Sequence, residues 1–460
     1  MLFQSQEFLL GLLPCVLAIW YGLARAGSVV GREWALIVLS LVFYGWWDIR
    51  FVPLLLAQTI LSWAIAEIFI ATGRRARWLI WLAITANLAV LGFFKYWTFF
   101  AESVLAGVGI DVPPVTILLP IGISFFTFEI ISYLADAGWH QAPRYPLRRF
   151  IVFVSLFPRL IAGPIVRHHE IIPQLDLDPL RSGVGERLAK GATLLTIGLA
   201  KKVFLADGLA PIADRAFTQA SSGIPDVTTA WSGALAFSFQ LFLDFSAYSE
   251  MAIGIALMLG LMLPENFRAP YAAVDLRDFW RRWHMTLSRY LRDYVYIPLG
   301  GSRHGVSSYL AATMLTMGLC GLWHGAGWTF IAWGLMHGVG LIVCRTWDQY
   351  GLRLPFLLSW AITMVFVIVG WVLFRAPDFS TAASMLAGMA GAGDGSPRFH
   401  GLGLLVLAAA LSTFGPTSYD VVTQRLRPSP ILAVVTALVA VAVVLEVGKG
   451  QPQTFIYFQF

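Results

Sequence analysis

Two histidines in a long uncharged stretch are the residues of this chain best suited to acid–base chemistry. The forty residues from Gly305 to Cys344 contain no Asp, Glu, Lys or Arg, yet they include His324 and His337. A neutral imidazole near physiological pH accepts a proton from an attacking hydroxyl group. Because an ionisable side chain is costly within an apolar stretch of this length, its presence usually has a functional reason. We therefore expect a buried histidine to carry any chemistry of this chain.

The local sequence favours His324 over His337 as the functional group. His324 lies in GLWHGAGW, residues 321–328, where glycines break the helix and free backbone groups that are tolerated only against protein or a water-filled cavity. We predict that His324 faces an aqueous pocket within the membrane. His337 lies in a helix interior, where packing is the better interpretation. The remaining histidines lack metal-ligand spacing, so we predict solvated side chains and no metal site; they are His140, His168, His169, His304 and His400.

A further histidine lies in a segment rich in arginine and tryptophan. Apolar residues recur there at intervals of three and four, which predicts an amphipathic helix over residues 276–294 that begins after an N-cap at Asp275 and ends before Pro298. His284 falls on the polar side of this helix. From the spacing alone, the favoured interpretation is a helix that lies on the membrane surface and contacts anionic lipid.

Other ionisable residues also interrupt apolar sequence. Each is expected to pair with an opposite charge or to line a cavity, and ion pairing is at least as good an interpretation as substrate contact. They are Glu129, Asp136, Lys201, Lys202, Asp207, Asp244 and Glu250.

The composition places nearly the whole chain in a membrane. Of its 460 residues, 58% are hydrophobic and 13% are charged, and the mean hydropathy is +0.72, whereas a soluble domain carries about 25% charged residues. Apolar stretches of ~20 residues predict an all-α polytopic bundle of about 11 to 13 spans. No linker divides the chain, so residues 1–460 are expected to form a single membrane domain.

The basic residues fall in short loops rather than along one stripe. The net charge is +6, but the clusters Arg25–Arg32, Arg74–Arg77 and Arg144–Arg149 follow alternate predicted spans, as the positive-inside rule requires. This distribution places the clusters in the cytoplasm and the N-terminus outside. It also argues against nucleic acid as a partner and for membrane lipid.

Three motifs around these histidines resemble the signature of the membrane-bound O-acyltransferase family. They are DFWRRWH (278–284), LRDYVYIPLGGSR (291–303) and GLWHGAGWTFIAWGLMHG (321–338). Further matches cover nearly the whole chain, and they include YGWWD (44–48), LGFFKYW (91–97), LPIGISFFTFEIISYLAD (119–136), FPRLIAGPIVR (157–167), DFSAYSEMAIG (244–254), NFRAPY (266–271) and the tail FIYFQF (455–460). The resemblance is closest to the bacterial branch of the family that takes part in alginate O-acetylation.

The resemblance implies a bundle with re-entrant or interfacial helices around a central tunnel, where a cytoplasmic acyl donor meets an acceptor from the far side. It places the family's catalytic histidine at His324 and a second, more variable polar position at His284. We expect His324 to accept the hydroxyl proton and His284 to orient the donor or stabilise the carbonyl oxygen. Arg277, Arg281 and Arg282 are candidates for attracting an anionic donor such as acetyl-CoA or an acyl carrier, and interfacial anchoring explains them equally well. No bound cofactor is expected.

The expected function is therefore O-acetylation of an alginate-like exopolysaccharide at a bacterial inner membrane. The partners would be the acyl donor and either the polysaccharide or a periplasmic acetyltransferase. A transporter or channel that feeds acyl groups to such a separate transferase is the alternative from another class. Acylation of a different cell-envelope polymer also stays open.

Overall fold

The structure is a computed structural model that describes residues 1–110, 117–140, 142–351, 353–395, 399–450 and 455–456. All regular elements within these ranges are helices, which confirms the predicted all-α class. Of the tail motif FIYFQF, Phe455 and Ile456 are described and residues 457–460 lie outside the described part of the chain.

The chain folds into two compact units, each assembled from segments that are distant in sequence. Unit 1 comprises Met1–Ile197, Ser249–Pro264 and Arg425–Thr454, and unit 2 comprises Gly198–Tyr248, Glu265–Gln424 and Phe455–Phe460. The single membrane domain expected from the sequence stays a prediction.

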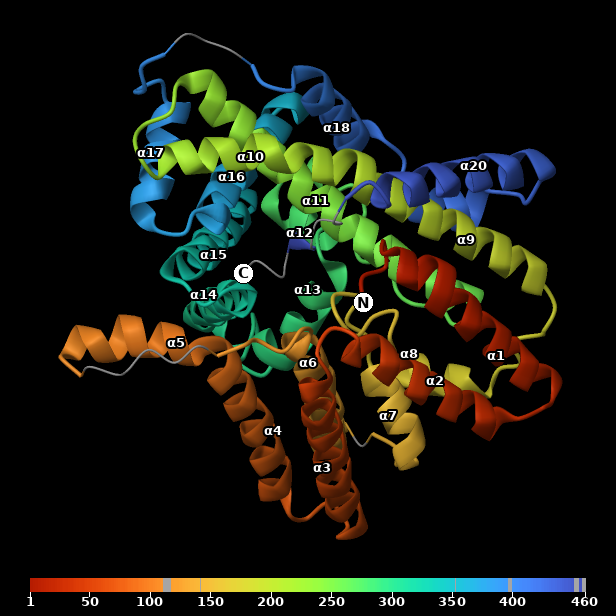
Figure 1. Ribbon diagram of the computed structural model, residues 1–460. Helices are drawn as coiled ribbons and strands as arrows, with labels where there is room; N and C mark the ends of the chain where they lie inside the picture. Colours follow the sequence, from red (N-terminus) through yellow and green to blue (C-terminus); the bar gives the residue numbers. More distant parts are fainter. Residues whose placement is uncertain (111–116, 141, 352, 396–398, 451–454, 457–460) are drawn as a thin grey trace. The chain divides into compact units, whose positions relative to one another are not determined.

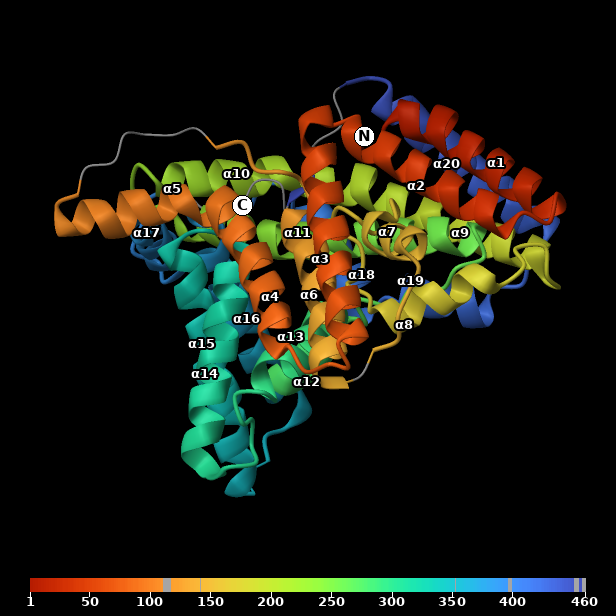
Figure 2. The same cartoon turned by 90° about the horizontal axis from the view of Figure 1, so that it is seen from below.

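Unit 1 contains a group of neighbouring helices with one strongly buried member. Helices α3 (Val52–Ala71), α4 (Arg77–Leu91) and α6 (Ile123–Ala135) lie side by side in Figures 1 and 2. Nearly every residue of α6 is buried, and its Glu129 forms an ion pair with the buried Arg159. This pairing confirms the expectation for Glu129. Unit 1 also includes α1 (Leu13–Arg25), α2 (Val29–Gly45), α7 (Leu147–Ser155), α8 (His168–Ile171) and α20 (Pro430–Val447).

Unit 2 is organised around a tight helical hairpin. Helix α14 (Gly305–His324) packs along α15 (Trp328–Gln349), and α16 (Phe356–Arg375) packs beside α15 (Figure 2). Glycines allow the close approach of α14 and α15, because a Cβ on Gly334 would lie 2.2 Å from a backbone oxygen of α14 and one on Gly321 would lie 2.2 Å from a backbone oxygen of α15. The unit also includes α10 (Asp207–Ala220), α12 (Leu276–Arg282), α13 (Met285–Leu291), α17 (Phe379–Met389), α18 (Leu402–Phe414) and α19 (Ser418–Asp420).

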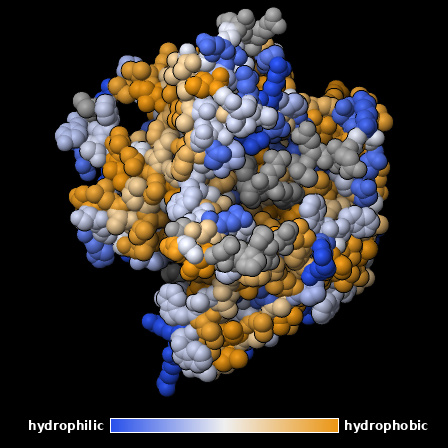
Figure 3. Space-filling model, turned by 60° about the vertical axis from the view of Figure 1, so that its left-hand side comes forward, coloured by the Kyte–Doolittle hydropathy of each residue, from blue (hydrophilic) through white to orange (hydrophobic). Residues whose placement is uncertain are grey.

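The lengths of the helices agree with a multi-pass membrane protein. Within the described residues, eight helices are long and apolar enough to cross a membrane, or nine if a bent pair near the C-terminus counts as one span. The predicted number of about 11 to 13 spans stays a prediction, because helices such as α2, with 17 residues, are shorter than the helices in this count and still within the range of spanning lengths. Several apolar stretches form helices too short to span, such as the 13 residues of α6 and the nine of α7. Large hydrophobic side chains are exposed on many of the helices that are long enough to cross a membrane, and hydrophobic residues cover much of the face in Figure 3.

Candidate active site

His324 lies at the tip of the α14–α15 hairpin. It is the last residue of α14, and α15 begins at Trp328 after a short turn. A side chain at Gly325 in this turn would overlap the ring of Phe330, at 2.2 Å. The glycine-broken turn predicted from the sequence is thus required by packing. His324 is only 2% exposed, and its ring centroid lies 5.2 Å from that of Trp333 and 5.3 Å from that of Phe374. The aqueous pocket expected at His324 stays a prediction.

His284 lies at a break in the helix predicted over residues 276–294. Asp275 caps α12 as expected, because its carboxylate accepts the backbone N–H of Asp278 at 2.7 Å. The single continuous helix is wrong, however. Helix α12 ends at Arg282, His284 adopts the left-handed conformation with φ of 42° and ψ of 54°, and α13 begins at Met285. A non-glycine residue in this region is strained and is maintained only by its surroundings.

The break turns His284 from a polar helix face into the core. The side chain is 0% exposed, which corrects the interpretation of His284 as a polar surface residue. Burial away from water lowers the pKa of the His284 imidazole to about 3, because the charged form loses its hydration. The imidazole is therefore neutral at physiological pH.

Asn266 determines which nitrogen of this neutral imidazole carries the proton. Its side-chain oxygen accepts the backbone N–H of Thr286 at 3.3 Å and the Thr286 hydroxyl at 2.9 Å. The same oxygen lies 3.1 Å from Nδ1 of His284. Because an amide oxygen only accepts hydrogen bonds, Nδ1 must be the protonated nitrogen. The lone pair is then on Nε2, which is buried and has no hydrogen-bond partner among the residues that the structure describes.

The two predicted catalytic histidines lie close together. Their ring centroids are 6.5 Å apart, with an angle of 58° between the ring planes. Phe245 and Phe267 also contact the His284 ring, with centroids at 4.7 Å and 6.1 Å. Two imidazoles on separate elements, in a largely apolar setting, are suited to proton transfer to and from a substrate placed between them.

The tautomer of His284 distinguishes between its two expected roles. A neutral Nε2 accepts a hydrogen bond from a substrate hydroxyl or amide group, but it does not donate one to a developing carbonyl oxyanion. The geometry therefore favours orientation of a substrate over stabilisation of the carbonyl. Asn266 was not singled out in the sequence, because an asparagine in a loop has no periodic pattern; its place in the NFRAPY motif was the available signal.

His337 is buried within the same aromatic region, as the packing interpretation predicts. The indole N–H of Trp280 donates to its Nδ1 at 3.3 Å, and its ring lies 4.9 Å from that of Trp333. Trp333 in turn contacts His324. His337 is thus linked to the predicted catalytic histidine through one shared tryptophan.

The three candidate donor-binding arginines occupy different environments. Arg277 pairs with Asp348 and has Asp275 at 3.7 Å. Arg282 pairs with Asp278 at 2.8 Å, while Arg281 is exposed. The positive charges of Arg277 and Arg282 are therefore already balanced by carboxylates. A donor-binding role for the three arginines stays a prediction.

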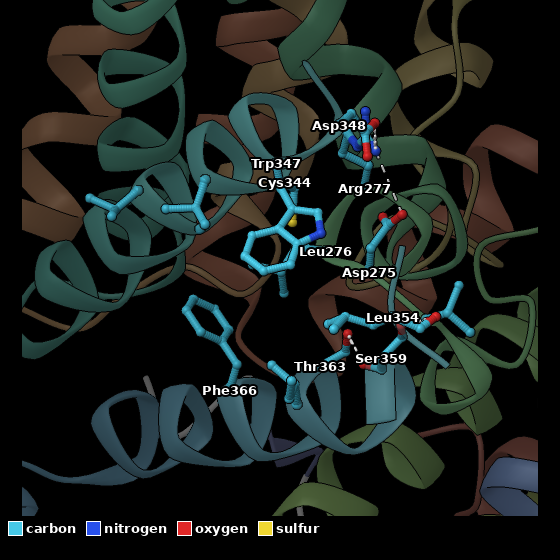
Figure 4. A pocket seen from close by; sticks show the side chains of 15 residues that line it. Asp275, Leu276, Arg277, Cys344, Trp347, Asp348, Leu354, Ser359, Thr363 and Phe366 are labelled. Atoms are coloured by element: carbon cyan, nitrogen blue, oxygen red, sulfur yellow. Dashed lines mark hydrogen bonds and ion pairs between the residues drawn. The ribbon is translucent and has the colours of Figure 1, made fainter. Parts of the chain in front are cut away.

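Arg277 lines a cavity of about 440 Å³ between the start of α12 and helices α15 and α16 (Figure 4). Its walls are mainly apolar, with Trp347 and Phe366 projecting into it and the Arg277–Asp348 pair at one side. Phe366 also contacts His337, with ring centroids 5.3 Å apart. The volume is in the range of small-molecule sites.

One of the histidines predicted to be solvated is buried in unit 1. His168 is 3% exposed, its Nε2 lies 3.1 Å from an Asp136 carboxylate oxygen and its Nδ1 lies 3.0 Å from the Tyr145 hydroxyl. The prediction of a surface His168 is wrong because its neighbours satisfy both ring nitrogens. His169 is exposed as predicted. Ligand atoms of Asp136, His168 and His169 lie within 4.8 Å of one another, but both His168 nitrogens already have protein partners.

Comparison with known proteins identifies relatives that share most of the chain. It is similar to the probable alginate O-acetylase AlgI of Azotobacter vinelandii, at 42% identity over 86% of this chain and 79% of the relative. The similarity to the probable alginate O-acetylase AlgI of Pseudomonas putida is 37% identity over 100% of both chains. The peptidoglycan O-acetyltransferase of Helicobacter pylori is 37% identical over 85% of this chain and 80% of its own length.

A family model supports the same assignment. The model for the membrane-bound O-acyltransferase family matches residues 78–385, a range that includes both His284 and His324. Together with the identities to full-length relatives, this match confirms the resemblance drawn from the motifs. The chain belongs to the membrane-bound O-acyltransferase family.

Proposed function

We propose that this O-acyltransferase uses an acetyl donor from the cytoplasm to acetylate hydroxyl groups of an exopolysaccharide at the bacterial inner membrane. The names of the two alginate O-acetylase relatives support the polysaccharide class of acceptor. The peptidoglycan O-acetyltransferase relative supports a different cell-envelope polymer as the second candidate acceptor. The positively charged loop clusters support a cytoplasmic face for the donor.

One observation carries the proposed chemistry: two buried imidazoles lie with their centroids 6.5 Å apart, and Asn266 holds one of them in a defined tautomer. Acyl transfer to a hydroxyl group needs a base for the attacking proton and an acid for the leaving group. A neutral imidazole serves as the base and, once protonated, as the acid.

In the proposed reaction, His324 removes the proton of a sugar hydroxyl group. At the same time, the oxygen of this hydroxyl group attacks the acetyl carbonyl carbon of a thioester. The carbon–sulfur bond breaks as the new ester bond forms. The departing thiolate then takes the proton from the His324 imidazolium, so that the enzyme returns to its starting state. Nε2 of His284 accepts a hydrogen bond from a second hydroxyl of the sugar or from an amide N–H of the donor, which orients that substrate.

The cavity beside Arg277 is the candidate site for the donor arm. Asp275 and Asp348 outweigh the single Arg277 charge there, so the walls suit an apolar or amide-containing chain better than a phosphate group. A pantetheine-like arm, shared by coenzyme A and acyl carriers, has this character. Phe366, His337 and Trp333 form successive ring contacts between the cavity and His324.

The competing proposal is a conduit that passes acyl groups to a separate periplasmic transferase. The two proposals differ in the need for an imidazole at position 324. A conduit requires the shape of the side chain, whereas base catalysis requires a nitrogen that accepts and releases a proton. His324→Gln preserves much of the shape and the capacity for hydrogen bonding but lacks the basicity.

The test is acetylation of the secreted polysaccharide in a deletion strain complemented with the wild type, His324→Ala or His324→Gln, with the amount of each protein in the membrane measured. Loss of acetylation with both variants at normal abundance would support imidazole catalysis. Retention with glutamine would favour the conduit. His304→Ala is the control, because His304 is an exposed histidine in the same unit.

A further inference from the structure

Three segments that are distant in sequence meet at a buried ion cluster in unit 2. Nζ of Lys202 lies 2.7 Å from a carboxylate oxygen of Asp207 and 3.1 Å from one of Asp244. The side chains of Lys202 and Asp244 are 3% and 2% exposed. The cluster confirms the expectation that these charges are paired, and it anchors one face of helix α11 (Val227–Met258).

The C-terminal segment is attached to the same cluster. The second carboxylate oxygen of Asp244 accepts the backbone N–H of Ile456 at 2.9 Å. The neighbouring Phe455 packs on α11, with its ring centroid 4.9 Å from that of Tyr248 and 5.7 Å from that of Phe245. Asp244 thus divides its two oxygens between Lys202 and the backbone of the tail. We use the name C-terminal latch for Asp244, Phe455 and Ile456.

The side chain of Phe245 connects the latch to the candidate active site. Phe245 follows Asp244 in the chain, and its ring contacts His284 edge to face, at 4.7 Å between centroids and 86° between planes. The same ring contacts Phe455 and is fully buried. The ring of Phe245 therefore contacts the imidazole of His284 and the ring of Phe455 at the same time.

His284 needs such support because its backbone is strained. A residue at φ of 42° keeps this conformation only when the surrounding structure determines it. Asn266 provides a hydrogen bond at Nδ1 of the imidazole, and Phe245 provides an edge-to-face ring contact. Loss of the second contact would allow the ring to move and water to reach Nε2.

We propose that the C-terminal latch is a positioning element that holds Phe245 against His284. It thereby keeps the imidazole oriented for acyl transfer and excludes water from Nε2. The latch residues act through Phe245 and not through contact with a substrate. The consequence for catalysis rests on the proposed function, whereas the effect on the accessibility of His284 does not. Two readouts are therefore needed.

The sharpest variant is Ile456→Pro, which removes the N–H donated to Asp244 and so detaches the segment that carries Phe455, without changing the Phe455 side chain itself. Ile456→Val keeps this N–H and is the matched control. Each protein is purified with its full chain, and kcat and KM are measured with acetyl-CoA and an oligosaccharide acceptor. In parallel, carbethoxylation of His284 is followed over time by peptide mass spectrometry.

We expect Ile456→Pro to lower kcat by about tenfold or more with little change in either KM, because the substrates still bind but an oriented group is displaced. Carbethoxylation of His284 should become faster. The valine variant should match the wild type in both readouts. An inserted Ile456→Pro protein with wild-type kcat and wild-type His284 reactivity would overturn the proposal.

A second pair of variants keeps the test decisive if the proline variant does not accumulate. Phe455→Leu weakens the ring contact with Phe245, and Phe414→Leu is its control at an exposed phenylalanine. Faster carbethoxylation of His284 in the first but not the second supports the latch; equal rates overturn it. If His284→Ala retains full activity, the catalytic proposal fails, while a faster reaction of His284 in the latch variants still supports the positioning contact.

Discussion

The side-chain oxygen of Asn266 lies 3.1 Å from Nδ1 of His284 and 3.3 Å from the backbone nitrogen of Thr286. A backbone N–H only donates, so its partner must be the oxygen of the asparagine amide. This oxygen then requires a proton on Nδ1. The backbone N–H of Thr286, which follows the helix break, fixes the orientation of the Asn266 amide. Through Asn266 it therefore determines which nitrogen of His284 is basic.

Substitution Asn266→Asp should change the pH dependence of the reaction. A carboxylate at this distance stabilises the imidazolium and raises the pKa of His284 above its native value, which burial holds well below the usual 6.5. As the pH falls through the raised pKa, Nε2 takes up a proton and no longer accepts a hydrogen bond. We expect kcat/KM of the variant to fall on the acid side at a pH closer to neutral than in the wild type. The measurement is the pH profile of kcat/KM from pH 5 to 8.5.

The control for this experiment is Asn87→Asp, which introduces a carboxylate into a buried polar cluster of unit 1. Its kcat/KM should have the pH dependence of the wild type. The role assigned to Asn266 would be wrong if Asn266→Asp also left the pH profile unchanged.

Substitution Gly334→Ala should destabilise the hairpin that carries His324. The new Cβ would lie 2.2 Å from the backbone oxygen of Met317, so the helices must separate. Overpacking of this kind costs about 1–3 kcal/mol. We expect a lower thermal midpoint in detergent and reduced activity. Gly403→Ala in α18, where no atom lies within 4 Å of the added Cβ, should not lower the midpoint.

Substitution Glu129→Gln should destabilise unit 1 more strongly than a surface change. It removes the carboxylate that pairs with the buried Arg159, and an unpaired buried charge costs about 3–5 kcal/mol. We expect little folded protein in the membrane. Asp48→Asn removes the partner of the exposed Arg50 and is the control. Normal accumulation and stability of the Glu129→Gln protein would show that the Glu129–Arg159 pair contributes little to the stability of unit 1.

Acetyl-CoA should protect Cys344 from thiol reagents. Cys344 lines the cavity proposed for the donor arm and is half-buried, whereas Cys320 is fully buried and Cys15 is exposed. In a Cys15→Ser background, labelling therefore reports mainly on Cys344. At a donor concentration of ten times Kd, the rate should fall about tenfold, in line with the fraction of sites occupied. An unchanged rate under these conditions would place the donor elsewhere.

The sequence by itself determined the class of the protein, the candidate histidines, the turn after His324 and the start of the helix after Asp275. An uncharged stretch around His324 indicates membrane helices because a bilayer excludes unpaired charges. The glycines around it indicate a tight turn, and Asp275 indicates a helix start. These are local properties, set by hydropathy over one span or by a few neighbouring residues. The family resemblance then assigned roles to His324 and His284.

Only the tertiary structure decided how these residues work together. The spacing of residues 276–294 satisfies a helical period, but packing overrides it at His284 and turns this side chain into the core. The partners Asn266, Phe245 and Ile456 come from separate segments and follow no common pattern in the sequence. A tautomer, a strained backbone and a shared ring contact depend on atoms that folding brings within a few ångströms, and local sequence does not encode those distances.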